Sequence, residues 1–327
     1  MKFLCNGFNL YGQLASPGYL LEKFTPVFGG YTTVKDICVG HTFSALNLGK
    51  SCKIITNGTE NDFGSSGEVI KMCTNDVRLV FLDDNGKLIK INLEDIDNPS
   101  EISGMLLMDS NEKIVNISCS SKLAVAYSDK GSLFNIPHKL DFMNEYIIDI
   151  QCGKEHCLLL DEHGNVYTFG RGSRGQLGHG QLEDELEPKQ VDGLAGIKIT
   201  QIAAGGWHSC ALSKDGDLYT WGWNGNGQLG LGIDGEPEEA SISVMASPRV
   251  IDFVDSQTNV MKIACGGRHT IVLLDDNRLY GCGWNKYKQL NNQDQENVYT
   301  FTYIHDLSNE EVLQLKCGPW NSVILCK

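Results

Sequence analysis

The stretch that decides the fold is Ile202-Ala-Ala-Gly-Gly-Trp-His208-Ser-Cys-Ala-Leu-Ser-Lys-Asp-Gly216, followed by Leu218-Tyr-Thr-Trp-Gly222 and Gly227-Gln-Leu-Gly230. A short β run ends in the glycine pair, and a second run starts at the histidine and carries small and apolar residues. Asp-x-Gly then makes a hairpin turn, because glycine accepts a positive φ. A third run completes a small antiparallel sheet that cannot bury its apolar face without neighbours.

The same pattern recurs on both sides of this stretch, in Ile150-Gln-Cys-Gly-Lys-Glu-His156-Cys and in Ile263-Ala-Cys-Gly-Gly-Arg-His269-Thr. Weaker copies lie eight residues before the hairpin glycines Gly86 and Gly131, near the start of the chain and near its end. The seven frame positions are His41, Arg78, Leu123, His156, His208, His269 and Asn321. Repetition of one small sheet predicts an all-β, seven-bladed propeller that forms a single domain over residues 1–327.

The two ends of the chain predict how the ring closes. The last copy stops at Lys327, before any third run, whereas Phe3-Leu-Cys-Asn-Gly7-Phe-Asn-Leu-Tyr-Gly12-Gln-Leu14 matches that missing half in frame. We therefore expect the N-terminal strand to complete the C-terminal blade, which removes the free sheet edges. The expected repeats cover approximately 30–60, 65–95, 113–140, 147–190, 199–250, 260–305, and 312–327 together with 1–14.

Composition limits the classes of partner and compartment. The formal net charge is −14, from 41 acidic and 27 basic residues, so the surface disfavours direct DNA binding and favours a basic partner. We find no signal-peptide core and no apolar run of the roughly 18 residues that a membrane span needs. We expect an intracellular protein that is not secreted, whose 12 cysteines are free thiols.

Several motifs together resemble the regulator-of-chromosome-condensation repeat family, whose members form seven-bladed propellers. They are Gly175-Gln-Leu-Gly178, Ala203-Ala-Gly-Gly-Trp-His-Ser209, Trp221-Gly-Trp-Asn224 and Cys317-Gly-Pro-Trp-Asn321. The resemblance is close over about residues 145–327 and weaker over 50–145, where the glycine punctuation is missing.

The resemblance implies a non-catalytic interaction scaffold without a cofactor, located in the nucleus and cytoplasm. The implied partner is a JmjC-type oxygenase (a histone lysine demethylase or arginyl hydroxylase), with histone or chromatin proteins beside it, and the implied role is in chromatin regulation and mitotic chromosome and spindle behaviour. The alternative is a guanine-nucleotide exchange factor for a Ran-like small GTPase. That activity would use a projecting wedge and a basic N-terminal tail, and we expect neither here. A third option is a tryptophan-based photoreceptor, for which Gly206-Trp-His-Ser and Gly267-Arg-His-Thr each carry half of the motif.

No catalytic or metal constellation is expected from the spacing. The repeat histidines His41, His156, His208 and His269 should be distributed around the ring, each bonded to a neighbouring loop backbone. Cysteines four residues before the frame positions interchange with Ala204, which indicates a small, buried site, and no Cys-x-x-Cys pair is present. Gly170-Arg-Gly172-Ser-Arg-Gly175 spells G-x-G-x-x-G, but no helix pattern follows, so we interpret it as an inter-blade turn.

Candidate partner-binding residues fall into two groups. The position before the frame residue holds Glu155, Trp207, Arg268 and Trp320, a set that predicts solvent exposure on one rim. We add Trp223 to this rim group and expect Trp221 and Trp284 to pack in the core. The second group is acidic and lies in expected inter-blade connections, where it would dock a basic partner; its members are Glu183, Asp184, Glu185 and Glu187, and a further run at Glu236, Glu238 and Glu239.

Overall fold

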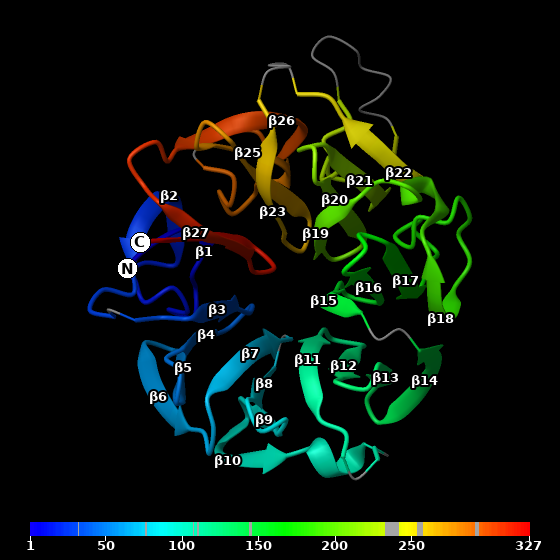
Figure 1. The fold of residues 1–327 in the computed structure, drawn as a ribbon. Coiled ribbons are helices and arrows are strands. Elements are labelled where there is room, and N and C mark those ends of the chain that lie inside the picture. The colour runs from blue at the N-terminus through cyan, green and yellow to red at the C-terminus, as the bar shows by residue number, and fades with distance from the viewer. Residues whose placement is uncertain are drawn as a thin grey trace.

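In a computed structural model of the chain, seven four-stranded antiparallel sheets surround one central axis (Figure 1). The structure describes residues 1–327 except 32, 76, 107, 110, 144–145, 233–241, 254–257 and 292–293. The predicted all-β architecture with seven blades is confirmed. The acidic run at Glu236, Glu238 and Glu239 lies outside the described residues.

In each of blades 1–3 the four strands follow one another across the sheet in chain order. Blade 1 contains β3 (Asp36–Val39), β4 (Ser44–Asn47), β5 (Ser51–Thr56) and β6 (Thr59–Gly64). Blade 2 contains β7 (Val69–Thr74), β8 (Arg78–Asp83), β9 (Leu88–Asn92) and β10 (Asp95–Glu101), followed by the 3-10 helix η1 (Ser103–Met105). Blade 3 contains β11 (Ile114–Cys119), β12 (Ala124–Ser128), β13 (Ser132–Asn135) and β14 (His138–Met143).

Blades 4–6 repeat the same plan with the stronger sequence motifs. Blade 4 contains β15 (Ile147–Cys152), β16 (His156–Asp161), β17 (Val166–Gly170) and β18 (Glu185–Gln190), followed by the 3-10 helix η2 (Asp192–Leu194). Blade 5 contains β19 (Ile199–Ala204), β20 (His208–Ser213), β21 (Leu218–Trp223) and β22 (Val244–Ile251). Blade 6 contains β23 (Val260–Cys265), β24 (His269–Leu274), β25 (Arg278–Trp284) and β26 (Asn297–Asp306).

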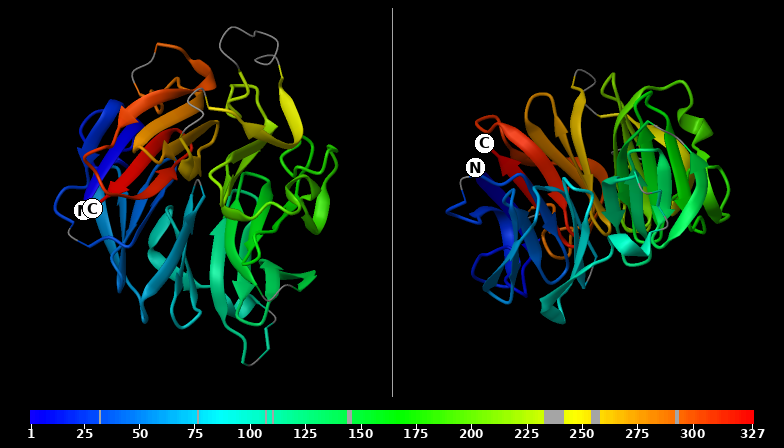
Figure 2. Two further views of the ribbon diagram at one scale, coloured as in Figure 1. Left: turned by 45° about the horizontal axis from the view of Figure 1, so that its top comes forward. Right: turned by 60° about the horizontal axis from the view of Figure 1, so that its bottom comes forward.

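Blade 7 joins both ends of the chain, as predicted. Its inner strands are β27 (Val312–Cys317) and β28 (Asn321–Cys326), and its outer strands are β1 (Lys2–Phe8) and β2 (Leu20–Val27). Strand β1 pairs with β28 from Lys2↔Cys326 to Gly7↔Asn321, and the two chain ends lie side by side in both views of Figure 2. The N-terminal share of this blade includes β2, beyond the segment 1–14 in which one strand was expected. Closure thus gives every blade two neighbours.

The connection between the first and second strands of each blade fixes the repeat frame, with one correction. In blades 4–7 a glycine N–H donates to the carbonyl of the frame residue, as from Gly205 to His208 at 2.9 Å. The equivalent bond in blade 1 runs from the Gly40 N–H to the carbonyl of Phe43, at 2.8 Å. Phe43 therefore occupies the frame position that we assigned to His41, which lies two residues earlier. The shared glycine, rather than the histidine letter, marks the frame.

The fourth strand of each blade changes the interpretation of two segments. The G-x-G-x-x-G segment lies between β17 and β18, so it is a turn within blade 4 and not an inter-blade turn. The acidic residues that follow also belong to blade 4: Glu185 and Glu187 lie on β18, and Asp184 directly precedes it. Both expectations were wrong because the outermost strand is largely exposed and polar, with little apolar alternation to reveal it.

Alternating strand direction gives the ring two different faces. We call the "link face" the one that carries the first-to-second strand links and the third-to-fourth strand turns, and the "hairpin face" the one with the second-to-third strand hairpins. Buried aliphatic and aromatic side chains fill the spaces between adjacent blades in seven clusters. None of the helices in the described part of the chain is long and apolar enough to cross a membrane.

Candidate interaction face

Backbone hydrogen bonds join the links of blades 4–7 across the link face. The Lys154 N–H donates to Gly206 O at 3.0 Å, Gly206 N–H to Gly267 O at 3.2 Å, and Gly267 N–H to Pro319 O at 3.1 Å. A Cβ atom on Gly206 would lie 2.3 Å from Gly267 O, so this approach requires glycine. The four links are therefore held in a fixed row, and each presents its next residue to solvent.

Beneath this row, the frame histidines form hydrogen-bonded knots between blades. Nε2 of His156, His208 and His269 lies 2.9, 2.9 and 3.1 Å from the hydroxyl of Ser209, Thr270 and Ser322 respectively, each in the next blade. Each hydroxyl donates its own proton to the carbonyl of Gln176, Gln228 or Gln289. The imidazole nitrogen must therefore be the donor, which fixes the neutral tautomer. Each Nε2 thus reaches the neighbouring backbone through a side-chain hydroxyl, and the backbone of His208 and of Asn321 also interacts with His156 and His269 respectively.

Burial disfavours the charged form of two of these histidines. It lowers the pKa of His156 and of His269 to about 3, and the neighbouring His208 adds to the lowering. All three rings are fully buried. They therefore support the links and are not an acid–base set.

The links and the adjacent ends and turns of the third strands together carry alternating tryptophan and arginine side chains. The guanidinium of Arg174 lies 4.0 Å from the centroid of Trp207 and 5.4 Å from that of Trp223. Arg268 lies 5.4 Å from Trp223 and 5.5 Å from Trp284, so each arginine bridges two rings. Trp207 and Trp223 also meet edge to face at 5.7 Å. Such stacking adds cation–π attraction and fixes both partners.

Aromatic rings continue the row into blades 7 and 1. Trp284 contacts Trp320 at 5.9 Å, and Tyr287 stacks on Trp320 at 5.0 Å. Phe8 packs against Trp320 at 5.2 Å and stacks on His41 at 5.3 Å. We call this continuous feature the aromatic–cationic band; it comprises Phe8, His41, Lys154, Arg174, Trp207, Trp223, Arg268, Trp284, Tyr287 and Trp320.

Glu155 closes the band in blade 4. Its carboxylate accepts a hydrogen bond from Trp207 Nε1 at 3.1 Å and pairs with Arg171 at 3.3 Å. The Trp207 hydrogen bond, with Arg171 and Arg174 nearby, lowers the pKa of Glu155 below its ordinary value despite partial burial. The exposed carboxylate of Glu296 likewise accepts a hydrogen bond from Trp284 Nε1 at 3.3 Å. Two carboxylates at the band are therefore bonded to its tryptophans, while Lys154, Arg174 and Arg268 are directed at aromatic faces.

The structure brings four of the predicted site residues together and separates the other four from them. Trp207, Trp223, Arg268 and Trp320 are all half-buried members of the band. Trp221 is fully buried as expected, but Trp284 is half-buried within the band, so its assignment to the core was wrong. The cause is that Trp284 ends its strand at the link face, one residue past the buried Gly283.

Sequence reasoning missed Arg174, Tyr287, Phe8 and His41 as members of the band. Arg174 and Tyr287 lie two residues before Gln176 and Gln289, in equivalent third-to-fourth strand turns. That shared offset is a signal that could have found them. No spacing rule, however, reveals that these turns meet the links of another blade.

The acidic residues lie on the outer side of blade 4. Asp184 accepts the Gly172 N–H at 2.9 Å, and Glu187 accepts the Asp141 N–H of blade 3 at 3.0 Å. Glu185 pairs with Lys189 at 2.9 Å, and Glu183 is exposed. Two of the four carboxylates therefore already have backbone partners within the chain.

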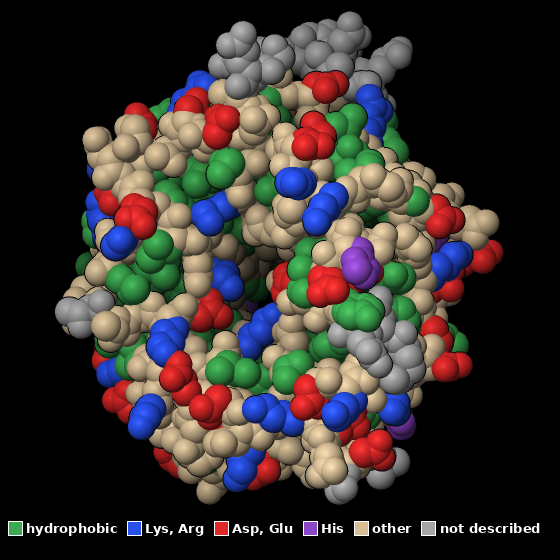
Figure 3. All heavy atoms as spheres, viewed as in Figure 1, with side chains coloured by type: hydrophobic (Ala, Val, Ile, Leu, Met, Phe, Trp, Pro, Cys, Tyr) green, Lys and Arg blue, Asp and Glu red, His purple; other side chains and the backbone are tan. Residues whose placement is uncertain are grey.

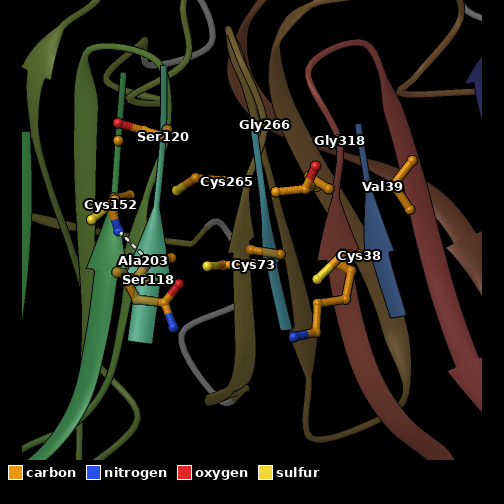
Figure 4. Close-up of a pocket in the computed structure, with 18 of the residues that line it drawn as sticks. Cys38, Val39, Cys73, Ser118, Ser120, Cys152, Ala203, Cys265, Gly266 and Gly318 are labelled. Atoms are coloured by element: carbon orange, nitrogen blue, oxygen red, sulfur yellow. Dashed lines mark hydrogen bonds between the residues drawn. The ribbon is translucent and has the colours of Figure 1, made fainter. Parts of the chain in front are cut away.

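The first strands of all blades line an axial cavity of about 800 Å³. Cys38, Cys73, Cys119, Cys152, Cys265 and Cys317 lie along it, and Figure 4 shows several of these thiols between the innermost strands. The expectation of fully buried cysteines was therefore wrong for Cys152, Cys265 and Cys317, which are half-buried at the cavity wall.

One thiol cluster has the donor types of a metal site. Ligand atoms of His208, Cys210 and Cys265 lie within 4.8 Å of one another, and the two sulfurs are 3.3 Å apart. Burial alone would raise the pKa of Cys265, but the Cys210 and His208 contacts lower it to about 5. A structural zinc site uses four ligands, and this cluster supplies three.

Comparison with known proteins assigns the repeats. A family model described as "Regulator of chromosome condensation (RCC1) repeat" matches residues 163–212 and 215–273. A second model with the same description matches 147–176, 199–228 and 260–289. Residues 147–289 of the chain contain RCC1 repeats. The matched ranges cover most of blades 4–6, where the glycine and frame histidine recur; Gly-Gln-Leu is present in blades 4 and 5, and Lys288-Gln-Leu takes its place in blade 6.

Among curated proteins, the RCC1-repeat chain is similar to human RCC1 domain-containing protein 1, with 37% identity over 208 residues. That match covers 54% of this chain and 55% of the human protein. It is also 33% identical over 258 residues to the ultraviolet-B receptor UVR8 of Arabidopsis thaliana, covering 72% of this chain and 55% of the receptor. The chain thus spans about half the length of the curated relatives it matches.

Solved structures share the whole fold of the RCC1-repeat chain. Prp20p of Saccharomyces cerevisiae has a TM-score of 0.84 and 16% identity, covering 99% of this chain and 91% of that chain. Human WBSCR16 has a TM-score of 0.80 and 16% identity, covering 100% and 98%. At this identity the likeness concerns the fold, and it extends over blades 1–3 as well.

Proposed function

We propose that the protein is a non-catalytic interaction scaffold and that the aromatic–cationic band is its partner-binding face. The observation that carries this proposal is the band itself, a row of half-buried tryptophans and arginines across blades 4–7. Tryptophan and arginine supply much of the binding free energy at protein interfaces. Rings held by rigid links lose little conformational entropy on binding, which favours affinity.

The band has a chemistry of its own, different from that of the molecule as a whole. Although the net charge is −14, the band carries Lys154, Arg174 and Arg268, and its carboxylate Glu155 is already paired. Guanidinium faces lie against rings, so the N–H edges are the groups left to bond a partner. The complementary surface would carry carboxylates beside apolar groups, rather than the basic residues suggested by net charge.

For the partner we propose a JmjC-type oxygenase, a histone lysine demethylase or arginyl hydroxylase, with a role in chromatin regulation and mitotic chromosome and spindle behaviour. The support is the resemblance of blades 4–7 to this branch of the repeat family and the similarity to human RCC1 domain-containing protein 1. Location in the nucleus and cytoplasm belongs to the same proposal. The acidic residues Glu183, Asp184, Glu185 and Glu187 remain a proposed contact for histones.

The test is the affinity of the purified oxygenase for the wild-type scaffold and for a Trp207→Ala/Trp284→Ala/Trp320→Ala variant. We expect the triple variant to lose about 30-fold or more in affinity, since central aromatic truncations each cost about 1–2 kcal/mol or more. The matched control is Leu186→Ser/Tyr303→Ser, which removes exposed apolar side chains from outer strands. Equal affinity for the wild-type and triple variant, with both folded, would remove the band from this role.

A second candidate is ultraviolet-B reception, which the alternation of Trp207, Arg174, Trp223, Arg268 and Trp284 favours together with the similarity to UVR8. Irradiation within the tryptophan absorption band should then change partner affinity or association state. A scaffold without light sensitivity would show the same affinity in the dark and after irradiation.

The alternative of nucleotide exchange is tested directly. Prp20p, which shares the fold, was described with its binding properties to Gsp1p and histones. Release of labelled GDP from a Ran-like GTPase, with and without stoichiometric protein, decides between exchange and scaffolding. Acceleration of release would replace the scaffold proposal, whereas an unchanged rate agrees with it.

A further inference from the structure

The first strand of six blades carries a β-bulge at the same place. In β7, β11, β15, β19, β23 and β27 the pairing shifts between the first and third residues of the strand. A bulge leaves one residue unpaired and re-aims its side chain, and such features concentrate beside functional sites. The six second residues are Ile70, Val115, Ile148, Thr200, Met261 and Leu313.

The bulges turn aliphatic side chains into solvent around the axis. Ile70, Val115, Ile148 and Met261 are 45%, 36%, 55% and 56% exposed, and Leu313 is half-buried. First strands begin at the hairpin face, so these residues lie at the hairpin-face ends of the innermost strands, where Leu313 lines the axial cavity and Ile70, Ile148 and Met261 directly precede lining residues. Figure 3 shows a face hollowed at its centre, with hydrophobic, basic and acidic side chains around the hollow. An exposed apolar ring of this kind marks an interaction site.

Just inside the ring, the third residues of the strands make the cavity mouth polar and charged. Lys71 bonds Asn116 Oδ1 at 2.6 Å and pairs with Asp149 at 3.1 Å. Lys316, deeper on β27, pairs with Asp36 at 3.1 Å. Asp149 and Asp36, the two carboxylates that line the cavity, therefore neutralise the charges of Lys71 and Lys316.

Lys154 and Arg268 line the link-face end of the cavity as members of the aromatic–cationic band, and Lys262 is the further lysine of its lining, beside Lys71 and Lys316. It is half-buried on β23 and lines the cavity, and within the described ranges it makes no ion pair or hydrogen bond. The bulge residue Met261 precedes it, and Leu313 occupies the same place on β27, the first strand of the adjacent blade. A partly desolvated, unpaired ammonium beside exposed aliphatic groups favours an anion that carries an apolar neighbour.

We propose that this mouth binds the apolar carboxyl-terminal end of a partner protein, with the terminal carboxylate on Lys262 and its apolar side chain against Met261, Leu313 and the facing ring residues. A chain end suits the site because an axial cavity in a closed ring admits one extended segment without a return path. The site lies at the hairpin-face end of the axial cavity, whereas the band residues Lys154, Trp207, Arg268 and Trp320 line the opposite end, so separate variants test the two proposals.

Fluorescence anisotropy with a labelled short peptide tests the proposal on the full chain. The probe is a Gly/Ser peptide that ends in Leu-Leu with a free carboxylate, and the comparison probes are its C-terminal amide and the same peptide ending in Ser-Ser. We expect the free-acid Leu-Leu peptide to bind with a Kd of about 100 μM or tighter, and both comparison probes to bind about tenfold or more weakly. Absence of binding by the free acid, or equal binding of acid and amide, would overturn the proposal.

Variants locate the site. Lys262→Met should weaken the free-acid probe about tenfold and abolish the preference for acid over amide, while Met261→Ser and Ile148→Ser should weaken it through lost apolar contact. Lys214→Met, an exposed lysine on the hairpin of blade 5, is the matched control and should change the Kd less than twofold. Unfolding curves confirm that each variant is folded. Unchanged binding by Lys262→Met would place the carboxylate elsewhere and contradict the assignment.

Discussion

Blades 4–7 and blades 1–3 have the same four-stranded plan but hold their neighbours by different contacts. Blades 4–7 join their links through backbone hydrogen bonds and the buried histidine knots. In blades 1–3, Phe43, Arg78 and Leu123 take the histidine place, and polar side chains make the joins, as from Asn75 to Ser120 O at 3.2 Å. Apolar packing between sheets therefore suffices to form a blade, and the knots serve another purpose.

That purpose is the placement of the link face. The aromatic–cationic band runs across blades 4–7 and into blade 1 through His41, and each frame histidine is buried directly under a link that carries a band residue. A Cβ on Gly205 would lie 2.1 Å from His208 Cε1, so the imidazole ring is in direct contact with the backbone of the link. The regular half of the ring is thus the half in which the rim is held rigidly, as a preorganised binding surface requires.

The largest expected loss of stability comes from removing β1, the strand that closes the ring in blade 7 and so connects blades 4–7 to blades 1–3. Deletion of residues 1–14 removes β1, which pairs with β28 over six residue pairs from Lys2↔Cys326 to Gly7↔Asn321. Both blade 1 and blade 6 then lose a neighbour, so we expect loss of a single cooperative transition or a fall in Tm of about 10 °C or more. Addition of the 1–14 peptide in trans should restore part of the loss. A truncated protein that melts like the full chain would contradict closure as a source of stability.

The next effect separates knots from apolar joins. His208→Ala removes a buried side chain and leaves Thr270 without its donor, so it should lower the free energy of unfolding by about 2–4 kcal/mol. Thr270→Val alone should cost less, and the double variant should show a coupling of about 1 kcal/mol or more. Leu123→Ala, at the half-buried frame position of blade 3, should cost only about 1–2 kcal/mol. Denaturant unfolding measures the free energy of unfolding of all four variants. If the costs of His208→Ala and Thr270→Val simply add in the double variant, the two residues are not coupled and the proposed knot is contradicted.

A smaller effect is the pH dependence of the regular half. The folded-state pKa of His156 and His269 is lowered by burial to about 3 from an ordinary 6.5, so the unfolded chain binds protons that the folded chain does not. Stability should therefore be complete above about pH 6.5 and fall toward pH 3, by about 1.4 kcal/mol per pH unit for each histidine. Substitution of both by asparagine, the residue found at this place in blade 7, should flatten the slope. An equal slope in that variant would assign acid sensitivity to carboxylates instead.

Much of the fold could be predicted because glycine and histidine mark one frame in every clear repeat. The frame assignment in blade 1 was wrong because it followed the residue type alone: His41 lies in the link, and Phe43 occupies the frame position. The fourth strands were invisible because residues such as 95–101 of β10 are almost entirely exposed and have no apolar period. The site was half predicted: Trp207 and Arg268 follow from the frame, whereas Arg174 and Tyr287 join them only through contacts between turns of different blades.

Hydrogen–deuterium exchange of the protein, free and bound to the purified JmjC-type oxygenase, tests the central claim most directly, because it locates the bound face without any substitution. The account predicts new protection at the links 153–156, 205–208, 266–269 and 318–321 and at the turns that carry Arg174 and Tyr287. Outer strand β18 and the blade hairpins should exchange as before. Protection confined to β18 and the hairpin face, with unchanged exchange in the links, would contradict the assignment of the aromatic–cationic band as the partner-binding face.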